Sequence, residues 1–145
     1  MNNLSLKRAT LKDSDQIAEL EKIASSPTYS ARLTDQEVKD AIKKENIFLI
    51  KKGKTVIGLV AYQVIKKKTA HFDGLVITPK FRRQGFAQEA MALMLKKMPK
   101  YSRVDLVVHP HNSPAISIYL KLGFTIESWS ANHFGDGEPR LVMAK

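Results

Sequence analysis

The stretch of sequence that decides the fold lies at residues 75–87 and reads LVITPKFRRQGFA. It opens on apolar residues typical of a buried strand, and apolar side chains then recur at helical spacing over residues 85–98 until Pro99. A strand is therefore expected to pass through a basic turn into a helix. Because the first amides of a helix have no partners inside it and lie at the positive end of its dipole, this junction can bind phosphate. Arg82 and Arg83 add positive charge there, although an ordinary loop before a helix has the same features.

Ahead of this stretch the chain shows strand and helix patterns. The strand candidates are residues 4–9, 46–50, 55–65 and 69–77. The last three are separated by two lysine-rich turns, so an antiparallel meander is the simplest arrangement. Capping boxes at residues 10–13 and 34–37 predict two helices, joined by an irregular connection over residues 25–33.

After the stretch, the pattern predicts one more helix and three more strands. The strands are expected over residues 103–109, 124–129 and 140–144. The helix is expected to begin with Ser113 as its cap and Pro114 as its first residue, and to end at Gly123. These elements predict an α/β fold of the α+β kind. A chain of 145 residues is the size of one domain, which we expect to span residues 1–145.

The composition is that of a folded protein, with 43% hydrophobic and 26% charged residues. The chain has no cysteine, which excludes disulfides, thiolate metal sites and a cysteine nucleophile, and suits a reducing compartment. No apolar run is long enough for a signal peptide or a membrane span, so we expect a cytoplasmic protein. The net charge of +10 favours a polyanionic partner. The lysine runs lack interleaved aromatic residues, so we interpret them as solvated hairpin turns rather than a nucleic-acid site. A phosphate-rich cofactor stays open as the anionic partner.

A second motif follows the next predicted strand, where residues 112–124 read NSPAISIYLKLGF. It resembles the N-x-x-A-x-x-x-Y-x-K-x-G-F element of the GNAT superfamily of N-acetyltransferases, and every defining position is filled. The earlier turn resembles the acyl-CoA motif [QR]-x-x-G-x-[GA] of the same family, matched by Arg82, Gly85 and Ala87. The resemblance implies a central mixed, mostly antiparallel sheet of about seven strands, with about four flanking helices and splayed fourth and fifth strands.

The resemblance also implies roles for individual residues toward acetyl-CoA, the expected cosubstrate. The backbone of the fourth strand would pair with the pantetheine arm, through Leu75, Val76 and Ile77. The pyrophosphate would rest on consecutive backbone amides, those of Arg83, Gln84, Gly85, Phe86 and Ala87. Asn112 would contact the pantetheine arm, although it could equally cap a helix. Tyr119 would protonate the departing CoA thiolate; from its chemistry alone it is a core side chain.

The general base is less well defined by the sequence. The candidates are His71, Asp73, His109 and His111, or a water molecule. His71 ranks first, because it falls where some lysine-directed relatives carry a catalytic glutamate. Glycine at position 74 suggests a bulge beside it. We expect no metal site, because His109 and His111 have no carboxylate or thiol at ligand spacing.

The acceptor amine is suggested by residues 132–143, which read NHFGDGEPRLVM. This segment is similar in part to the tail of protein amino-terminal acetyltransferases, including the ribosomal-protein alanine type. That subfamily often carries a glutamate or histidine where Val107 stands. An α-amine, with a pKa near ~8 against ~10.4 for lysine, needs less help from a base, which favours a peptide amino terminus.

Other functions stay open at this stage. The acceptor could be a polyamine, an aminoglycoside or a protein lysine. The chain could also be a non-catalytic acyl-CoA-binding module or a basic adaptor for RNA. It could be a monomer or a homodimer.

Overall fold

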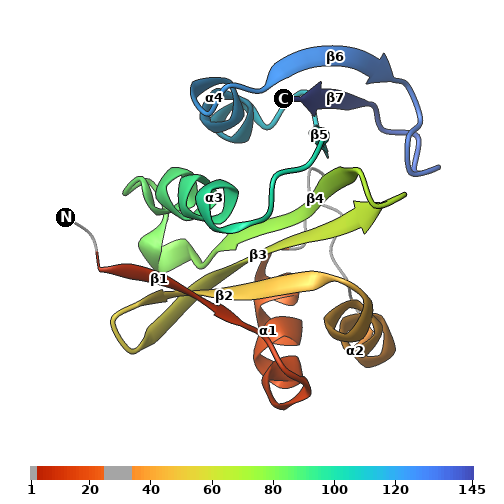
Figure 1. Ribbon diagram of the computed structural model, residues 1–145. Helices are drawn as coiled ribbons and strands as arrows, with labels where there is room; N and C mark the ends of the chain where they lie inside the picture. The colour runs from red at the N-terminus through yellow and green to blue at the C-terminus, as the bar shows by residue number, and fades with distance from the viewer. Residues whose placement is uncertain (1–2, 25–33) are drawn as a thin grey trace.

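A seven-stranded mixed sheet runs through the computed structural model, which describes residues 3–24 and 34–145 (Figure 1). The strand order in the sheet is β1-β2-β3-β4-β5-β7-β6. The strands are β1 (Leu4–Arg8), β2 (Asn46–Lys52), β3 (Thr55–Ile65), β4 (Thr69–Ile77), β5 (Arg103–Val108), β6 (Thr125–Ser130) and β7 (Arg140–Ala144). The helices are α1 (Ser14–Ala24), α2 (Asp35–Lys44), α3 (Phe86–Lys97) and α4 (Ser113–Lys121), with short 3-10 turns η1 (Leu11–Asp13) and η2 (Pro79–Phe81). The predicted fold class, sheet type and helix number are confirmed.

The predicted meander is confirmed, because β2, β3 and β4 pair antiparallel in sequence order. Both lysine-rich turns contain left-handed residues, as tight hairpins require. Gly53 has φ +61°, while Lys66 and Lys67 have φ +52° and +63°. The sequence limits of β3, β4 and β7 agree with the expected ones residue for residue.

The only parallel pair in the described sheet is that of β4 with β5, and it is short. Residues 69–72 are in register with residues 103–106, from Thr69 opposite Arg103 to Phe72 opposite Leu106. Beyond Phe72, β4 continues beside β3 alone, and β5 continues beside β7. The predicted splay between the fourth and fifth strands is therefore present, and it opens the sheet at its centre.

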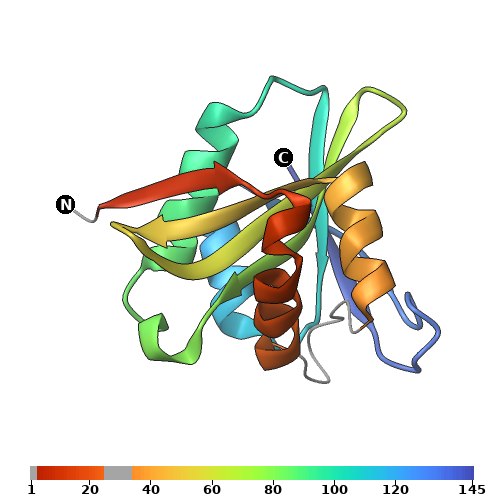
Figure 2. The same ribbon diagram turned by 90° about the horizontal axis from the view of Figure 1, so that it is seen from below.

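Helices α1 and α2 cover one face of the sheet and α3 covers the other (Figures 1 and 2). An apolar cluster lies under the helices on each face. On one face, Ile17 and Leu20 of α1 and Val38 of α2 pack against the strands. On the other face, α3 contributes Met91 and Met94. Burial of these side chains removes apolar area from water at about 25 cal/mol per Å² and holds the helices on the sheet.

Several predicted boundaries need correction. The first capping box begins the 3-10 turn η1 and not an α-helix, which starts at Ser14. The cap of α4 is Asn112 and not Ser113, because the Asn112 side chain accepts a hydrogen bond from the Ala115 amide. His109 lies just beyond β5, and Phe124 precedes β6. The predicted connection at residues 25–33 lies outside the described residues. No helix in the described part of the chain is long and apolar enough to cross a membrane.

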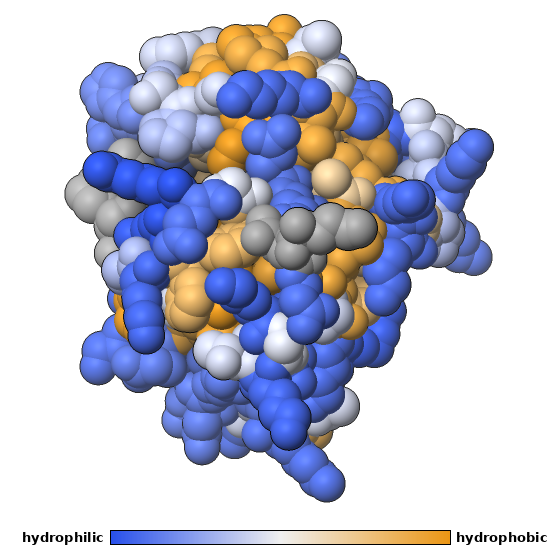
Figure 3. Space-filling view, turned by 90° about the vertical axis from the view of Figure 1, so that its left-hand side faces the viewer, coloured by the Kyte–Doolittle hydropathy of each residue, from blue (hydrophilic) through white to orange (hydrophobic). Residues whose placement is uncertain are grey.

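The hydropathy of the surface differs between the two ends of the molecule. Figure 3 shows hydrophobic side chains gathered at the upper end of one face, where Figure 1 places α4 and β6. Leu120 of α4 is 48% exposed, and Ile126 of the edge strand β6 is 51% exposed. The lower end of this face is mainly hydrophilic, consistent with the excess of lysine and arginine.

Candidate active site

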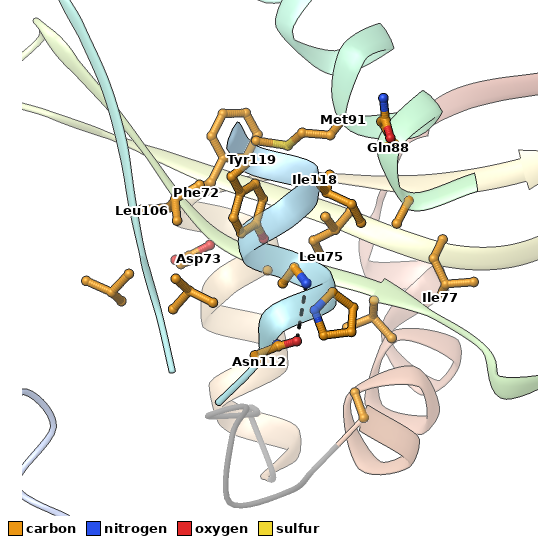
Figure 4. Close-up of a pocket in the computed structure, with 18 of the residues that line it drawn as sticks. Phe72, Asp73, Leu75, Ile77, Gln88, Met91, Leu106, Asn112, Ile118 and Tyr119 are labelled. Carbon is orange, nitrogen blue, oxygen red and sulfur yellow. Dashed lines mark hydrogen bonds between the residues drawn. The ribbon is translucent and has the colours of Figure 1, made fainter. Parts of the chain in front are cut away.

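A cleft of about 1000 Å³ lies where β4 and β5 separate. Its walls come from both strands and from the helices α3 and α4, as Figure 4 shows. Leu75 and Ile77 line it from β4, Leu106 from β5, and Tyr119 from α4. The cleft is large enough for an extended ligand and forms because the sheet lacks hydrogen bonds between the diverging strands. Every residue assigned to the cofactor in the sequence, except Gln84, lines this cleft.

The turn between β4 and α3 is shaped to hold an anion. Arg83 has φ +63°, and Gly85, the residue that caps α3, has φ +83°. Gly85 provides no side chain to the first turn, and no capping side-chain hydrogen bond occurs there within the described residues. A Cβ built at Gly85 would meet no atom within 4 Å, so the space in front of the helix is open. The first amides of α3 therefore point into the cleft, as phosphate binding requires.

Arg82 has a different role from that of its neighbour. Its Nε donates a hydrogen bond of 2.8 Å to the carbonyl oxygen of Ile77, which ties the turn to the end of β4. Gln84 similarly donates from Nε2 to the Lys80 carbonyl oxygen at 3.2 Å. Both side chains therefore fix the turn, while that of Arg83 is exposed beside the start of α3.

A β-bulge interrupts β4 just before the segment that lines the cleft. Ala61 of β3 is opposite Gly74, whereas Tyr62 is opposite Phe72, so Asp73 is the extra residue. The bulge predicted from the glycine at position 74 is thus present, displaced by one residue. After it, Leu75 packs with the α3 cluster and Val76 with the α1 and α2 cluster. Since β3 pairs with one edge of this segment, the amides on the opposite edge face the opening.

Tyr119 extends from α4 into the space between the two strands (Figure 4). Its ring packs edge-on against Phe124 with 5.9 Å between centroids. Burial raises the pKa of the Tyr119 phenol to about 12. The ring is partly exposed by area, but that area faces the cleft and not open solvent. At neutral pH the hydroxyl therefore keeps its proton and can donate it.

Asn112 lines the same cleft from the start of α4. Its Oδ1 accepts a long hydrogen bond of 3.4 Å from the Ala115 amide, drawn as the dashed line in Figure 4. This bond makes Asn112 the helix cap that the sequence allowed. The side-chain amide nitrogen is left to contact a ligand, so capping and cofactor contact do not exclude each other.

The structure distinguishes between the histidine candidates for the general base, which the sequence could not do. His109 is only 2% exposed, and both of its ring nitrogens are engaged. Its Nδ1 accepts from the His111 amide at 3.1 Å, so the proton lies on Nε2, which is 3.2 Å from Oε1 of Glu138. A ring with both nitrogens occupied offers no lone pair to an amine. Within the described residues, His111 is not among those that line the cleft.

His71 and Asp73 do line the cleft. They alternate with Ala70 and Phe72, which pack in the cluster under α3, so both lie on the face of β4 covered by α1 and α2. Gln63 stands opposite His71 and donates from Nε2 to Asp73 at 3.1 Å. Nδ1 of His71 is 2.6 Å from Oδ1 of Asp105. Tyr119 approaches from the opposite face of the sheet. The opening between β4 and β5 thus has a base candidate on one side and an acid candidate on the other.

Charges in the cleft are divided between its two sides. Arg82 and Arg83 stand at the α3 end, while Glu37 and Glu45 line the side formed by α2, together with Asp73. Lys121 and Arg140 also line the cleft. The basic end suits phosphate, and the acidic side suits a protonated amine.

Two residues that support the cleft from behind its lining were not identified from the sequence. Asp105 gives no local signal, because its partner is set by the register of β4 on β5. Gly58 of β3 interrupts an apolar run, but its close approach to β4 depends on strand packing. Among the described residues, no group of three or more metal-ligating side chains occurs.

Comparison with known proteins agrees with this geometry. Residues 14–124 match the family model described as acetyltransferase (GNAT) family. An N-alpha-acetyltransferase of Sulfurisphaera tokodaii is 25% identical over 153 residues, covering 96% of this chain and 90% of the relative. The N-terminal acetyltransferase B complex catalytic subunit NAA20 of Arabidopsis thaliana is 35% identical over 78 residues, covering 52% of this chain and 45% of the relative.

Solved structures share the fold over nearly the whole chain. A mutant spermidine N-acetyltransferase SpeG from Vibrio cholerae superposes with a TM-score of 0.82 at 20% identity, covering 99% of this chain and 93% of that one. An acetyltransferase of the GNAT family from Streptococcus pneumoniae gives 0.75 at 18% identity, covering 98% of both. The diverging strands, the uncapped start of α3 and the cleft between them fit acetyl-CoA. The chain therefore belongs to the GNAT acetyltransferase family and is an acetyl-CoA-dependent N-acetyltransferase.

Proposed function

We propose that the protein transfers the acetyl group of acetyl-CoA to the α-amino group of a peptide or protein. The observation that carries this choice of acceptor is the match of 96% of the chain to an N-alpha-acetyltransferase. The second relative, matched over about half the chain, is also an N-terminal acetyltransferase subunit. The segment at residues 132–143, whose sequence first suggested this acceptor, contributes Phe134 and Arg140 to the cleft. The cytoplasmic location of the protein stays a prediction, and so does its oligomeric state, a monomer or a homodimer.

The proposed reaction gives a role to several of the cleft residues. The amides of residues 83–87 hold the pyrophosphate, and the open edge of residues 75–77 pairs with the pantetheine arm and holds the thioester oxygen. Asn112 contacts the same arm. His71 accepts a proton from the amine, whose nitrogen attacks the thioester carbonyl carbon. The carbon–sulfur bond breaks, and Tyr119 gives its proton to the departing CoA sulfur.

A second acceptor class is favoured by the charge of the cleft. Glu37, Glu45 and Asp73 line its α2 side. Carboxylates at that position attract a polycation such as spermidine, which the structurally similar SpeG enzyme is named for. An α-amino terminus brings a single positive charge and a peptide backbone, so the two acceptors differ in charge and in shape.

One panel of acceptors separates these possibilities. Acetyl-CoA consumption is followed by thiol release with a lysine-free peptide carrying a free amino terminus, the same peptide blocked at its terminus and carrying one lysine, and spermidine. We expect turnover of the first peptide at a kcat/KM at least about tenfold above the other two, equal to ~1.4 kcal/mol of transition-state binding. Preference for spermidine or for the lysine peptide would overturn the choice of acceptor and leave the acetyltransferase activity in place.

A further inference from the structure

Asp105 is directly opposite His71 in the parallel register of β4 and β5, one pair before the strands separate. Its Oδ1 is 2.6 Å from Nδ1 of His71. A carboxylate of this kind only accepts hydrogen bonds, so Nδ1 must carry the proton. In the neutral ring the lone pair then belongs to Nε2. Within the described residues, no hydrogen bond to Nε2 is formed.

The other carboxylate oxygen of Asp105, Oδ2, accepts a hydrogen bond from Arg103. Arg103 donates from Nε to Oδ2 of Asp105 at 2.9 Å, and its two terminal nitrogens donate to both oxygens of Glu127 at 2.7 and 2.8 Å. The hydrogen bonds to Glu127 and Asp105 raise the pKa of Arg103 above its usual range, so the guanidinium stays charged. The side chain of Asp105 is only 15% exposed, whereas those of Arg103 and Glu127 are 38% and 46% exposed. The His71–Asp105 pair is therefore more shielded from solvent than the Arg103–Glu127 pair.

We propose that Asp105 is a positioning residue that fixes the Nδ1–H tautomer and the ring orientation of His71, so that Nε2 faces the cleft as the acceptor of the amine proton. This inference rests on the proposed role of His71 but not on the identity of the amine. Arg103 holds the carboxylate in place through its own hydrogen bond to Asp105, whereas the more exposed Glu127 is bonded to Arg103 and is not part of the proposed positioning. His109 lacks this arrangement, because both its nitrogens are already bonded.

The Asp105→Asn variant tests the tautomer directly. Arg103 is always a donor, so the amide oxygen of the variant turns toward Nε of Arg103, and the amide NH2 faces His71. Nδ1 of His71 must then accept, which moves the proton to Nε2 and removes the lone pair from the cleft. Since a general base contributes about 10²- to 10⁴-fold, we expect kcat to fall by ~10²-fold with little change in the KM for acetyl-CoA.

A double-mutant cycle distinguishes this role from a purely structural one. If Asp105 acts through His71, then Asp105→Asn should cost less than about threefold in a His71→Ala background, although each single change costs ~10²-fold. Glu127→Gln is the matched control. It weakens the exposed outer pair with Arg103 but keeps the Asp105 carboxylate, so kcat should stay within about threefold of wild type. Multiplied losses in the double variant would overturn the proposal.

The tautomer of the wild-type protein supplies a readout that does not depend on the activity of any variant. Nitrogen NMR of histidine-labelled protein, at a pH where the ring is neutral, should show His71 protonated on Nδ1, assigned by its loss in His71→Ala. Protonation on Nε2 would overturn the proposal. Kinetics are measured with whichever amine of the panel is acetylated best. Turnover of spermidine with a non-additive cycle would refute the proposed acceptor and still support Asp105 as a positioning residue.

Discussion

Gly58 of β3 lies so close to Val76 of β4 that a Cβ built on it would be 1.9 Å from the Val76 carbonyl oxygen. No side chain tolerates that distance, so the two strands approach closely at this point only because residue 58 is glycine. Val76 is in the segment of β4 assigned to the pantetheine arm. The position of that segment therefore depends on a residue in the neighbouring strand.

Replacement of Gly58 by alanine should displace β4. We expect Gly58→Ala to lower the free energy of unfolding by about 1–3 kcal/mol through overpacking, and to weaken acetyl-CoA binding. Urea denaturation and calorimetric titration of acetyl-CoA measure the two effects. Gly53→Ala is the control, because Gly53 has φ +61° in a hairpin away from the cleft and its replacement should cost stability alone. Normal acetyl-CoA affinity in Gly58→Ala would disprove the dependence of the binding wall on this contact.

Gly85→Glu should abolish acetyl-CoA binding while the protein stays folded. The new carboxylate would stand beside the pyrophosphate, and charge repulsion of a few kcal/mol predicts a loss of at least ~100-fold in affinity. A carboxylate at the start of α3 interacts favourably with the helix dipole, so the helix itself should persist. Gly85→Gln has the same bulk and the same strain at φ +83°. It should bind at least ~10-fold tighter than Gly85→Glu, and equal affinities would refute an anion site at this turn.

Tyr119→Phe should slow the chemical step and spare cofactor binding. Phenylalanine keeps the ring packing against Phe124 and removes only the hydroxyl. Single-turnover experiments should show a rate about 10²-fold lower, with the Kd for acetyl-CoA unchanged, because general acid catalysis contributes about that much. An unchanged chemical rate would remove Tyr119 as the proton donor.

The pKa of Tyr119 gives a test by titration. Burial raises this pKa to about 12, so Tyr119 keeps its proton as the pH rises through ~10, where a fully exposed phenol ionises. The unfolded chain loses this proton near pH ~10, so the contribution to stability is constant below that pH and declines as pH rises toward 12. The difference in tyrosinate absorbance between wild type and Tyr119→Phe should therefore appear near pH 12. A difference appearing near pH ~10 would show an exposed phenol.

Variants of Asn112 separate its two roles. Asn112→Ala removes the hydrogen bond to the Ala115 amide and should cost ~1 kcal/mol of stability, as lost helix caps do. Asn112→Ser restores a capping oxygen but not the amide nitrogen. We expect the serine variant to recover stability and to keep the weakened acetyl-CoA affinity of the alanine variant. Recovery of both properties by serine would assign Asn112 to capping alone.

Much of the fold could be predicted because its signals are local. Apolar runs bounded by lysine-rich turns identified β3 and β4 to the residue. Thr34 with Glu37 marked the start of α2 through a capping box that is present in the structure. The boundary errors had local causes too. Asn112 and Ser113 are both good caps, and sequence does not show which side chain meets the free amide.

The features of the candidate site also fall into two groups, those set by local sequence and those set by tertiary packing. The sequence by itself determined the turn and helix start at Gly85 and the placement of Tyr119 on α4, because a turn, a helix start and a helical spacing are encoded by neighbouring residues. Tertiary structure decided which histidine has a carboxylate partner and where the sheet opens. His71 and Asp105 are 34 residues apart, and they meet because α3 returns the chain to lie parallel to β4. A pairing register between distant strands is a property of their packing in space, so no local pattern could specify it.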